Sequence, residues 1–138
     1  MSRIIQYIVL HCTAGPKHQS TEDIQKYWRE TLGWNNPGYH YLINYDGSVD
    51  ELSPEYKITN GVKGYNANAI HISYKGGVVG GRPTDTRSEA QKEAMFSLLK
   101  DMKVRYPMAE ILGHRDFPGV TKACPSFDVK DWIKQVNL

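Results

Sequence analysis

The sequence feature that most constrains the fold is the run RIIQYIVLHC, which extends from Arg3 to Cys12. Its β-branched and apolar residues, followed by the turn-forming stretch TAGPKHQ, are typical of a buried strand. His11 lies at the C-terminal end of this strand, where sheet proteins often bind ligands. Gln6 interrupts the apolar run and no small-residue cleavage site follows it, so we interpret the run as a strand rather than a signal peptide.

Two helices are indicated by capping residues and by apolar residues at helical spacing. Ser20 and Asp23 resemble a capping box, with Asp in place of Glu, at the start of a helix that ends near Leu32. The predicted buried face of this helix comprises Ile24, Tyr27, Trp28 and Leu32. The longest helix lies within TRSEAQKEAMFSLLKDMKVRYP and ends before Pro107. Its predicted buried face comprises Gln91, Met95, Leu98, Leu99 and Met102.

Further strands complete the predicted sheet. GYHYLINYDGSVDEL predicts a hairpin whose turn is Asp46-Gly47. Residues 68–74 and the segment EILGH predict two more strands, and the second of these ends at His114. A terminal helix from about Val129 would direct Trp132, Ile133 and Val136 inward. We therefore expect one α/β domain over residues 1–138, with a central mixed β-sheet flanked by helices.

Composition excludes several classes of protein. A chain of 138 residues with 40% hydrophobic and 23% charged residues is an ordinary globular domain. The formal net charge of +2 is too small to predict nucleic-acid binding, although it is compatible with an anionic partner such as a bacterial wall. No stretch approaches the roughly 20 apolar residues that a membrane span requires. We expect a monomer that is made in the cytoplasm.

Two of the five histidines occupy positions that suggest chemistry. His11 and His114 each end a predicted strand, and each is next to a cysteine or a glycine-containing loop. Because two strand ends of one sheet can meet at the same rim, these distant residues can lie close together. His18 falls in a polar loop and His71 in a strand of mixed residue types, so we interpret both as solvated or structural histidines.

Cys124 can supply a third ligand for a metal. A thiolate together with two imidazoles suits zinc, and three protein ligands leave the fourth tetrahedral position open to water, as in catalytic zinc sites. Lys122 precedes Cys124 by two residues, so in an extended segment the two side chains point the same way. A cation at that place could stabilise the oxyanion that forms when hydroxide attacks a carbonyl.

Two other interpretations of the cysteines remain open from the residues alone. Cys12 and Cys124 could form a disulfide, although this would remove a ligand and leave the two histidines unexplained. Cys124 could instead be a small buried apolar residue. Other metal motifs do not fit: the chain has no CxxC pair, no HExxH helix, and no glutamate two residues after His11 as zinc deaminases require.

Five segments in order resemble the type 2 N-acetylmuramoyl-L-alanine amidases, a family that includes amidase-type phage lysozymes and animal peptidoglycan recognition proteins. The segments are IVLHCTA, GYHYLINYDGSV, GYNANAIHISYKGG, GHRD and KACPSFD, and together they extend over nearly the whole chain. The resemblance implies that zinc is held by His11, His114 and Cys124. It also implies an active-site tyrosine at Tyr39 and a catalytic lysine at Lys122.

The function implied by the resemblance is hydrolysis of the amide between the lactyl group of N-acetylmuramic acid and L-alanine of the stem peptide. We expect Tyr39 to position water or assist proton transfer, whereas without the resemblance it would be interpreted as a hairpin tyrosine packed on the core. The chain departs from the family near Val62, where members often have histidine. It also has Ala69-Ile70-His71 where Ser-Ile-Gly is frequent. These positions are associated with the substrate groove and its supporting strand.

The prediction is therefore a zinc-dependent peptidoglycan amidase, either a phage or prophage endolysin or a bacterial wall-remodelling enzyme, that acts on the cell wall after release. The alternative is a non-catalytic muropeptide-binding module or a regulator of an intracellular partner. The alternation of side chains along a strand places Cys12 opposite His11, which favours packing over ligation for this cysteine.

Overall fold

A computed structural model describes residues 3–138, in which five strands form one sheet in the order β3-β2-β4-β1-β7. The central strand β1 (Tyr7–Cys12) pairs in parallel with β4 (Ala69–Tyr74) on one side and with β7 (Glu110–Gly113) on the other. β2 (Tyr41–Ile43) is parallel to β4, whereas β3 (Val49–Glu51) is antiparallel to β2. The mixed central sheet and the single α/β domain are as predicted.

The first strand begins at Tyr7 rather than at Arg3, which corrects the predicted start. The residues before it still contact the sheet, because the Gln6 N–H donates to the Asn68 carbonyl over 2.8 Å. The Arg3 guanidinium donates to the carbonyl oxygens of Asn66 and Ala69 over 3.0 and 2.9 Å. These backbone and side-chain contacts hold the segment without extending the strand.

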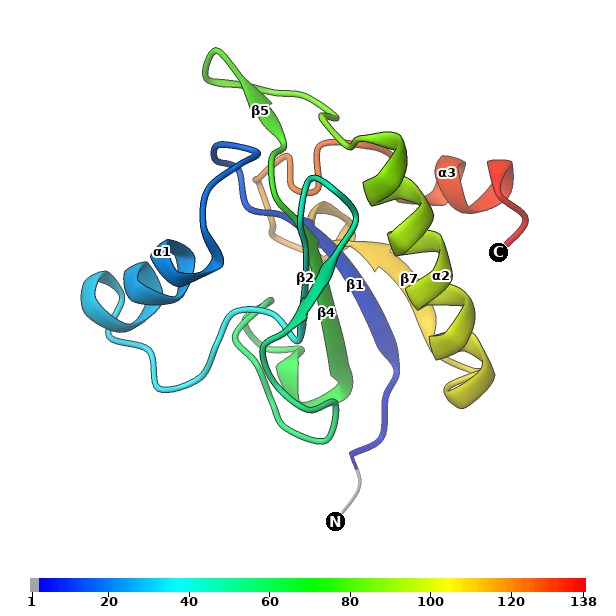
Figure 1. Ribbon diagram of the computed structural model, residues 1–138. Helices are drawn as coiled ribbons and strands as arrows, with labels where there is room; N and C mark the ends of the chain where they lie inside the picture. The colour runs from blue at the N-terminus through cyan, green and yellow to red at the C-terminus, as the bar shows by residue number, and fades with distance from the viewer. Residues whose placement is uncertain (1–2) are drawn as a thin grey trace.

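Alternation along β1 divides the molecule into two layers. Ile8, Leu10 and Cys12 belong to the main core cluster, together with apolar residues of α2 (Glu89–Arg105) and α3 (Val129–Gln135). Val9 belongs to a separate cluster on the other face of the sheet. Figure 1 shows α2 and α3 on one side of the sheet and α1 on the other. Both faces of β1 are covered, which explains why its sequence is apolar almost throughout.

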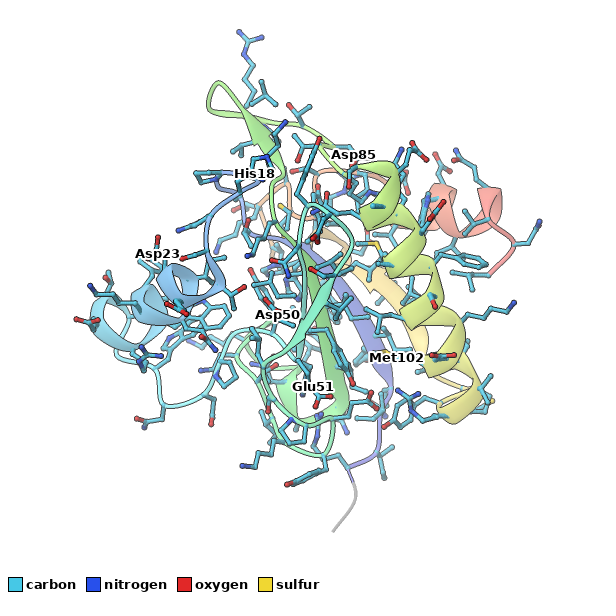
Figure 2. All side chains as sticks on the ribbon, in the orientation of Figure 1. His18, Asp23, Asp50, Glu51, Asp85 and Met102 are labelled. Atoms are coloured by element: carbon cyan, nitrogen blue, oxygen red, sulfur yellow. The ribbon has the colours of Figure 1, made fainter. Side chains whose placement is uncertain are left out.

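The long helix α2 packs as predicted, and it begins at a capping box that was not predicted. The Ser88 hydroxyl accepts from the Gln91 N–H and the Gln91 side chain accepts from the Ser88 N–H, both over 3.0 Å, which completes a capping box. Four residues of the predicted face are buried and Leu98 is half-buried. One of them, Met102, is labelled in Figure 2 and has no exposed surface. Gln91 is fully buried, and its Nε2 donates to the carbonyls of Ile43 and Lys75, so the start of α2 is joined to the end of β2 and to the residue that follows β4.

The first helical segment has the predicted extent but is less buried than predicted. α1 (Thr21–Lys26) begins after the Ser20 cap, whose hydroxyl accepts from the Asp23 N–H over 3.1 Å, and it continues as a π-helical turn (Tyr27–Thr31). Ile24 and Trp28 pack against the sheet at Leu42. Tyr27 and Leu32 are 51% and 41% exposed, so their predicted burial is wrong. The helix contacts the sheet only along a narrow strip, and these two side chains line an open groove instead.

The remaining elements include a confirmed hairpin. β2 and β3 are joined through Asp46-Gly47, where Gly47 has φ of 90°, a conformation that favours glycine. In α3, Trp132 is buried while Ile133 and Val136 are half-buried against the main core. A small pair of strands, β5 (Val78–Val79) and β6 (Arg82–Pro83), was not predicted. Within residues 3–138, none of the helices combines the length and the apolar character needed to cross a membrane.

Candidate metal centre

Three side chains from distant parts of the chain converge at one end of the sheet. The ligand atoms of His11, His114 and Cys124 all lie within 4.8 Å of one another. His11 Nδ1 is 3.8 Å from Cys124 Sγ, and the two imidazole ring centroids are 4.8 Å apart. Zinc bonds of about 2.0–2.1 Å to nitrogen and about 2.3 Å to sulfur imply an N···S separation of about 3.6 Å at tetrahedral angles. The donor set and its dimensions therefore fit a zinc ion.

Strand topology explains why the two histidines meet. Because β1 and β7 are parallel neighbours, with Leu10 opposite Gly113, their C-terminal ends lie side by side. His114 begins a 3₁₀ turn, η3 (His114–Asp116), immediately after β7. The Asp116 carboxylate accepts from the Gly113 N–H over 2.8 Å and holds this turn in place. A Cβ on Gly113 would lie 2.9 Å from Pro125 Cδ, so glycine allows the cysteine loop to approach.

The loop that carries Cys124 is held by backbone contacts. The Arg115 N–H donates to the Cys124 carbonyl over 2.9 Å, which joins this loop to the histidine turn. The Tyr74 hydroxyl, at the end of β4, donates to the Pro125 carbonyl over 2.7 Å. The Cys12 N–H lies 3.2 Å from Cys124 Sγ and donates to it. An amide donor at the sulfur stabilises a thiolate, which is the form that binds metals.

Cys12 points into the main core rather than toward the metal ligands. It is 4% exposed, and both cysteines are free thiols, so the disulfide interpretation does not fit this structure. A Cβ on Gly77 would lie only 2.4 Å from Cys12 Sγ, which explains the glycine at that position. Hydrogen bonding with Cys124 lowers the pKa of the Cys12 thiol, and the same interaction together with burial raises the pKa of Cys124.

Burial keeps both candidate histidine ligands neutral. It lowers the pKa of His11 well below its ordinary value, with further lowering from His71, His114 and Lys122. Burial also lowers the pKa of His114, again with a contribution from Lys122. A neutral imidazole offers a lone pair, which is the form required for binding a metal.

The convergent residues line a groove of about 620 Å³, which Tyr39 and Lys122 also line. The Tyr39 hydroxyl donates to the Cys12 carbonyl over 3.3 Å, and its ring centroid is 5.1 Å from that of His11. Burial raises the pKa of the Tyr39 phenol. Lys122 is exposed. One wall of the groove is aromatic and comprises Tyr27, Trp28 and Trp34. All five residues singled out from the sequence therefore share one groove.

Sequence reasoning missed the part played by His71. This residue is fully buried, and its Nδ1 lies 2.8 Å from His11 Nε2. It stands opposite Val9 in the pairing of β4 with β1, so it shares a face of the sheet with His11. Alternation alone could not find this contact, because it depends on the register between two strands. His18 is exposed in the loop between β1 and α1, where its ring packs against Tyr45, as expected for a solvated histidine (Figure 2).

The fold and the groove define an α/β protein with a candidate three-ligand metal centre that is open on one side, an arrangement typical of hydrolytic zinc sites. Residues 1–127 match the family described as N-acetylmuramoyl-L-alanine amidase. The chain belongs to this family, as its sequence segments indicated.

Individual relatives support the same assignment. The chain is 35% identical over 136 residues to the endolysin of Klebsiella phage KP32, with 95% of this chain and 87% of the relative covered. It is 34% identical over 134 residues to the endolysin of Escherichia phage T7, with the same shares covered. Among solved structures, the Ph2119 endolysin from the Thermus scotoductus MAT2119 bacteriophage superposes with a TM-score of 0.83 and 28% identity. That alignment covers 98% of this chain and 86% of the other.

Proposed function

We propose that this chain is a zinc-dependent amidase of the endolysin type, built as one domain over residues 1–138. Its substrate would be peptidoglycan, and it would cleave the amide between N-acetylmuramic acid and L-alanine of the stem peptide. One observation carries the proposal: in a member of the amidase family, His11, His114 and Cys124 converge on an open groove. We further propose that it acts as a monomer on the cell wall.

The three converging side chains would hold the metal through His11 Nδ1, a ring nitrogen of His114 and Cys124 Sγ. Zinc in this site would supply Lewis-acid polarisation of the scissile carbonyl and would lower the pKa of bound water toward about 7. The chain prepares the ligands for this role, because burial keeps the imidazoles neutral and the Cys12 amide hydrogen-bonds the sulfur.

Lys122 and Tyr39 would act on the reacting groups directly. The Lys122 ammonium lies at the groove beside the two histidines and would stabilise the negative charge that develops on the carbonyl oxygen. The Tyr39 hydroxyl uses its proton to donate to the Cys12 carbonyl, so its oxygen lone pairs remain available to accept from water. Its raised pKa keeps the phenol neutral, which suits a group that orients the nucleophile.

The proposal is tested by metal analysis combined with wall digestion. We expect about one zinc ion per chain, release of free stem peptides from purified sacculi, and loss of that release after chelation. Cys124→Ser should lose both zinc and activity, whereas Ser48→Ala, in the hairpin turn, should keep both. Glycan fragments in place of free peptides would exclude the amidase reaction.

A further inference from the structure

A continuous chain of hydrogen bonds runs behind the candidate metal centre, from the backbone of Val62 to His11. The Val62 N–H donates to Asn66 Oδ1 over 2.8 Å. The same oxygen lies 2.8 Å from His71 Nε2. On the other side of that imidazole, His71 Nδ1 lies 2.8 Å from His11 Nε2. We call this chain the His11–His71–Asn66 relay.

The backbone at one end of the relay determines where each proton lies. A backbone N–H can only donate, so the oxygen of Asn66, not its nitrogen, must face Val62. That oxygen can only accept, so His71 carries its proton on Nε2. A neutral imidazole has one N–H, which leaves His71 Nδ1 to accept from the Nε2–H of His11. The other nitrogen, His11 Nδ1, then keeps its lone pair, and this atom faces Cys124 Sγ.

Packing prevents the His71 ring from adopting another orientation. The residue has no exposed surface, which favours the neutral imidazole that the relay requires. A Cβ on Gly61 would lie 2.2 Å from His71 Nδ1, so the ring occupies space that only glycine leaves free. Its backbone N–H donates to His40 Nδ1 over 3.0 Å. Asn66 is held as well, because it begins the 3₁₀ turn η2 (Asn66–Asn68) that leads directly into β4.

We propose that His71 and Asn66 are positioning residues that hold His11 in its Nε2–H tautomer and thereby direct the Nδ1 lone pair at the metal. This inference rests on the proposed metal centre. Histidine ligands commonly donate their second N–H to a carboxylate or carbonyl oxygen, which orients the ring. Here a neutral imidazole takes that place and its orientation derives from the Val62 backbone, so the ring is fixed without adding negative charge beside the metal.

The tautomer itself is measurable in the metal-free protein by long-range ¹H–¹⁵N NMR of the imidazole rings. In the wild type we expect His11 to carry its proton on Nε2. His71→Leu removes the acceptor, and a mixture of His11 tautomers should result. His71→Asn places an amide oxygen near the position of His71 Nδ1 and should restore the Nε2–H form. His18→Leu, at an exposed histidine, should leave the His11 signals unchanged.

Zinc affinity, measured by competition with a chromophoric chelator, supplies the second readout. We expect His71→Leu to weaken binding by about 10- to 100-fold, with recovery to within about fivefold in His71→Asn. Asn66→Ala, at a half-buried position outside the strands, provides the same test with less disturbance of the core and should weaken binding in the same direction. A purely structural role would lower stability in the Leu and Asn variants alike without this difference in affinity.

Two results would overturn the relay: a wild-type His11 protonated on Nδ1, or undiminished zinc affinity in both His71→Leu and Asn66→Ala. These outcomes are separable from a failure of the proposed function. If the wild-type protein bound no zinc, the metal centre would be wrong, while the NMR spectrum would still decide the tautomer. If it bound zinc and cleaved sacculi but the variants matched it, only the relay would be wrong.

Discussion

Replacing Lys122 with alanine should slow catalysis while leaving the metal bound. The ammonium group lies at the groove but remains exposed to solvent, so its attraction for a developing oxyanion is partly screened. A unit charge at about 4 Å contributes from about 1 kcal/mol in bulk water to about 4 kcal/mol near a protein surface. An exposed lysine belongs in the lower half of this range, near 2 kcal/mol, which corresponds to about a 30-fold loss in kcat.

The assay is the initial rate of stem-peptide release from purified sacculi, with zinc content measured on the same samples. Lys100→Ala removes a positive charge from the exposed side of α2 and serves as the matched control. Lys122→Arg keeps the charge and should retain more activity than the alanine variant. Full activity in Lys122→Ala, or a loss that follows a loss of zinc, would refute the role of this side chain in stabilising charge.

Three further predictions concern side chains that are buried or half-buried. Tyr39→Phe keeps the ring that packs on Trp28 but loses the hydroxyl. Activity should therefore fall about 10-fold or more, while the midpoint of urea unfolding stays close to that of the wild type. Burial lowers the pKa of His40 to about 4, whereas this group binds its proton near pH 6.5 in the unfolded chain. The free energy of unfolding should therefore fall by at most about 3 kcal/mol as the pH falls from 6.5 to 4. In His40→Gln, urea unfolding at a series of pH values should show a weaker dependence of this free energy on pH. Gln91→Leu leaves the Lys75 carbonyl without its donor, while the Ile43 carbonyl still accepts from the Lys75 N–H, and it should lower the free energy of unfolding in urea by about 1–3 kcal/mol.

The parts of the fold that could be predicted are those set by short-range rules. The cap at Ser20, the Asp46-Gly47 turn and the apolar period of α2 all depend on residues within a few positions of each other. The first helix shows where such rules stop. Its spacing predicted four buried residues, but Tyr27 and Leu32 are exposed because they line the groove instead of packing on the sheet. Which of the four positions face the sheet depends on the contact of Ile24 and Trp28 with Leu42 of β2, and not on the helix sequence alone.

The candidate site likewise has one part that could be predicted from the sequence and one part that could not. His11 and His114 could be brought together from sequence because both follow strands, and parallel neighbours end at the same edge. The contact of His71 with His11 could not, since it requires the register that places Val9 opposite His71. A shift of one residue would turn His71 into the main core, and no local pattern distinguishes these two registers.

The alternation along β1 also explains how one short strand can serve both stability and chemistry. Ile8, Leu10 and Cys12 face α2 and have at most 4% exposed surface, so substitutions there should act mainly on the free energy of unfolding. Val9 and His11 face the other layer, where His11 bonds to His71 in the relay and also lines the groove. Cys12 contributes to both stability and the site, because its side chain packs in the core while its backbone N–H donates to Cys124 Sγ. A substitution such as Cys12→Ala changes the core side chain but keeps that N–H. It should therefore lower stability more than zinc affinity, and this separation follows directly from the period of two along the strand.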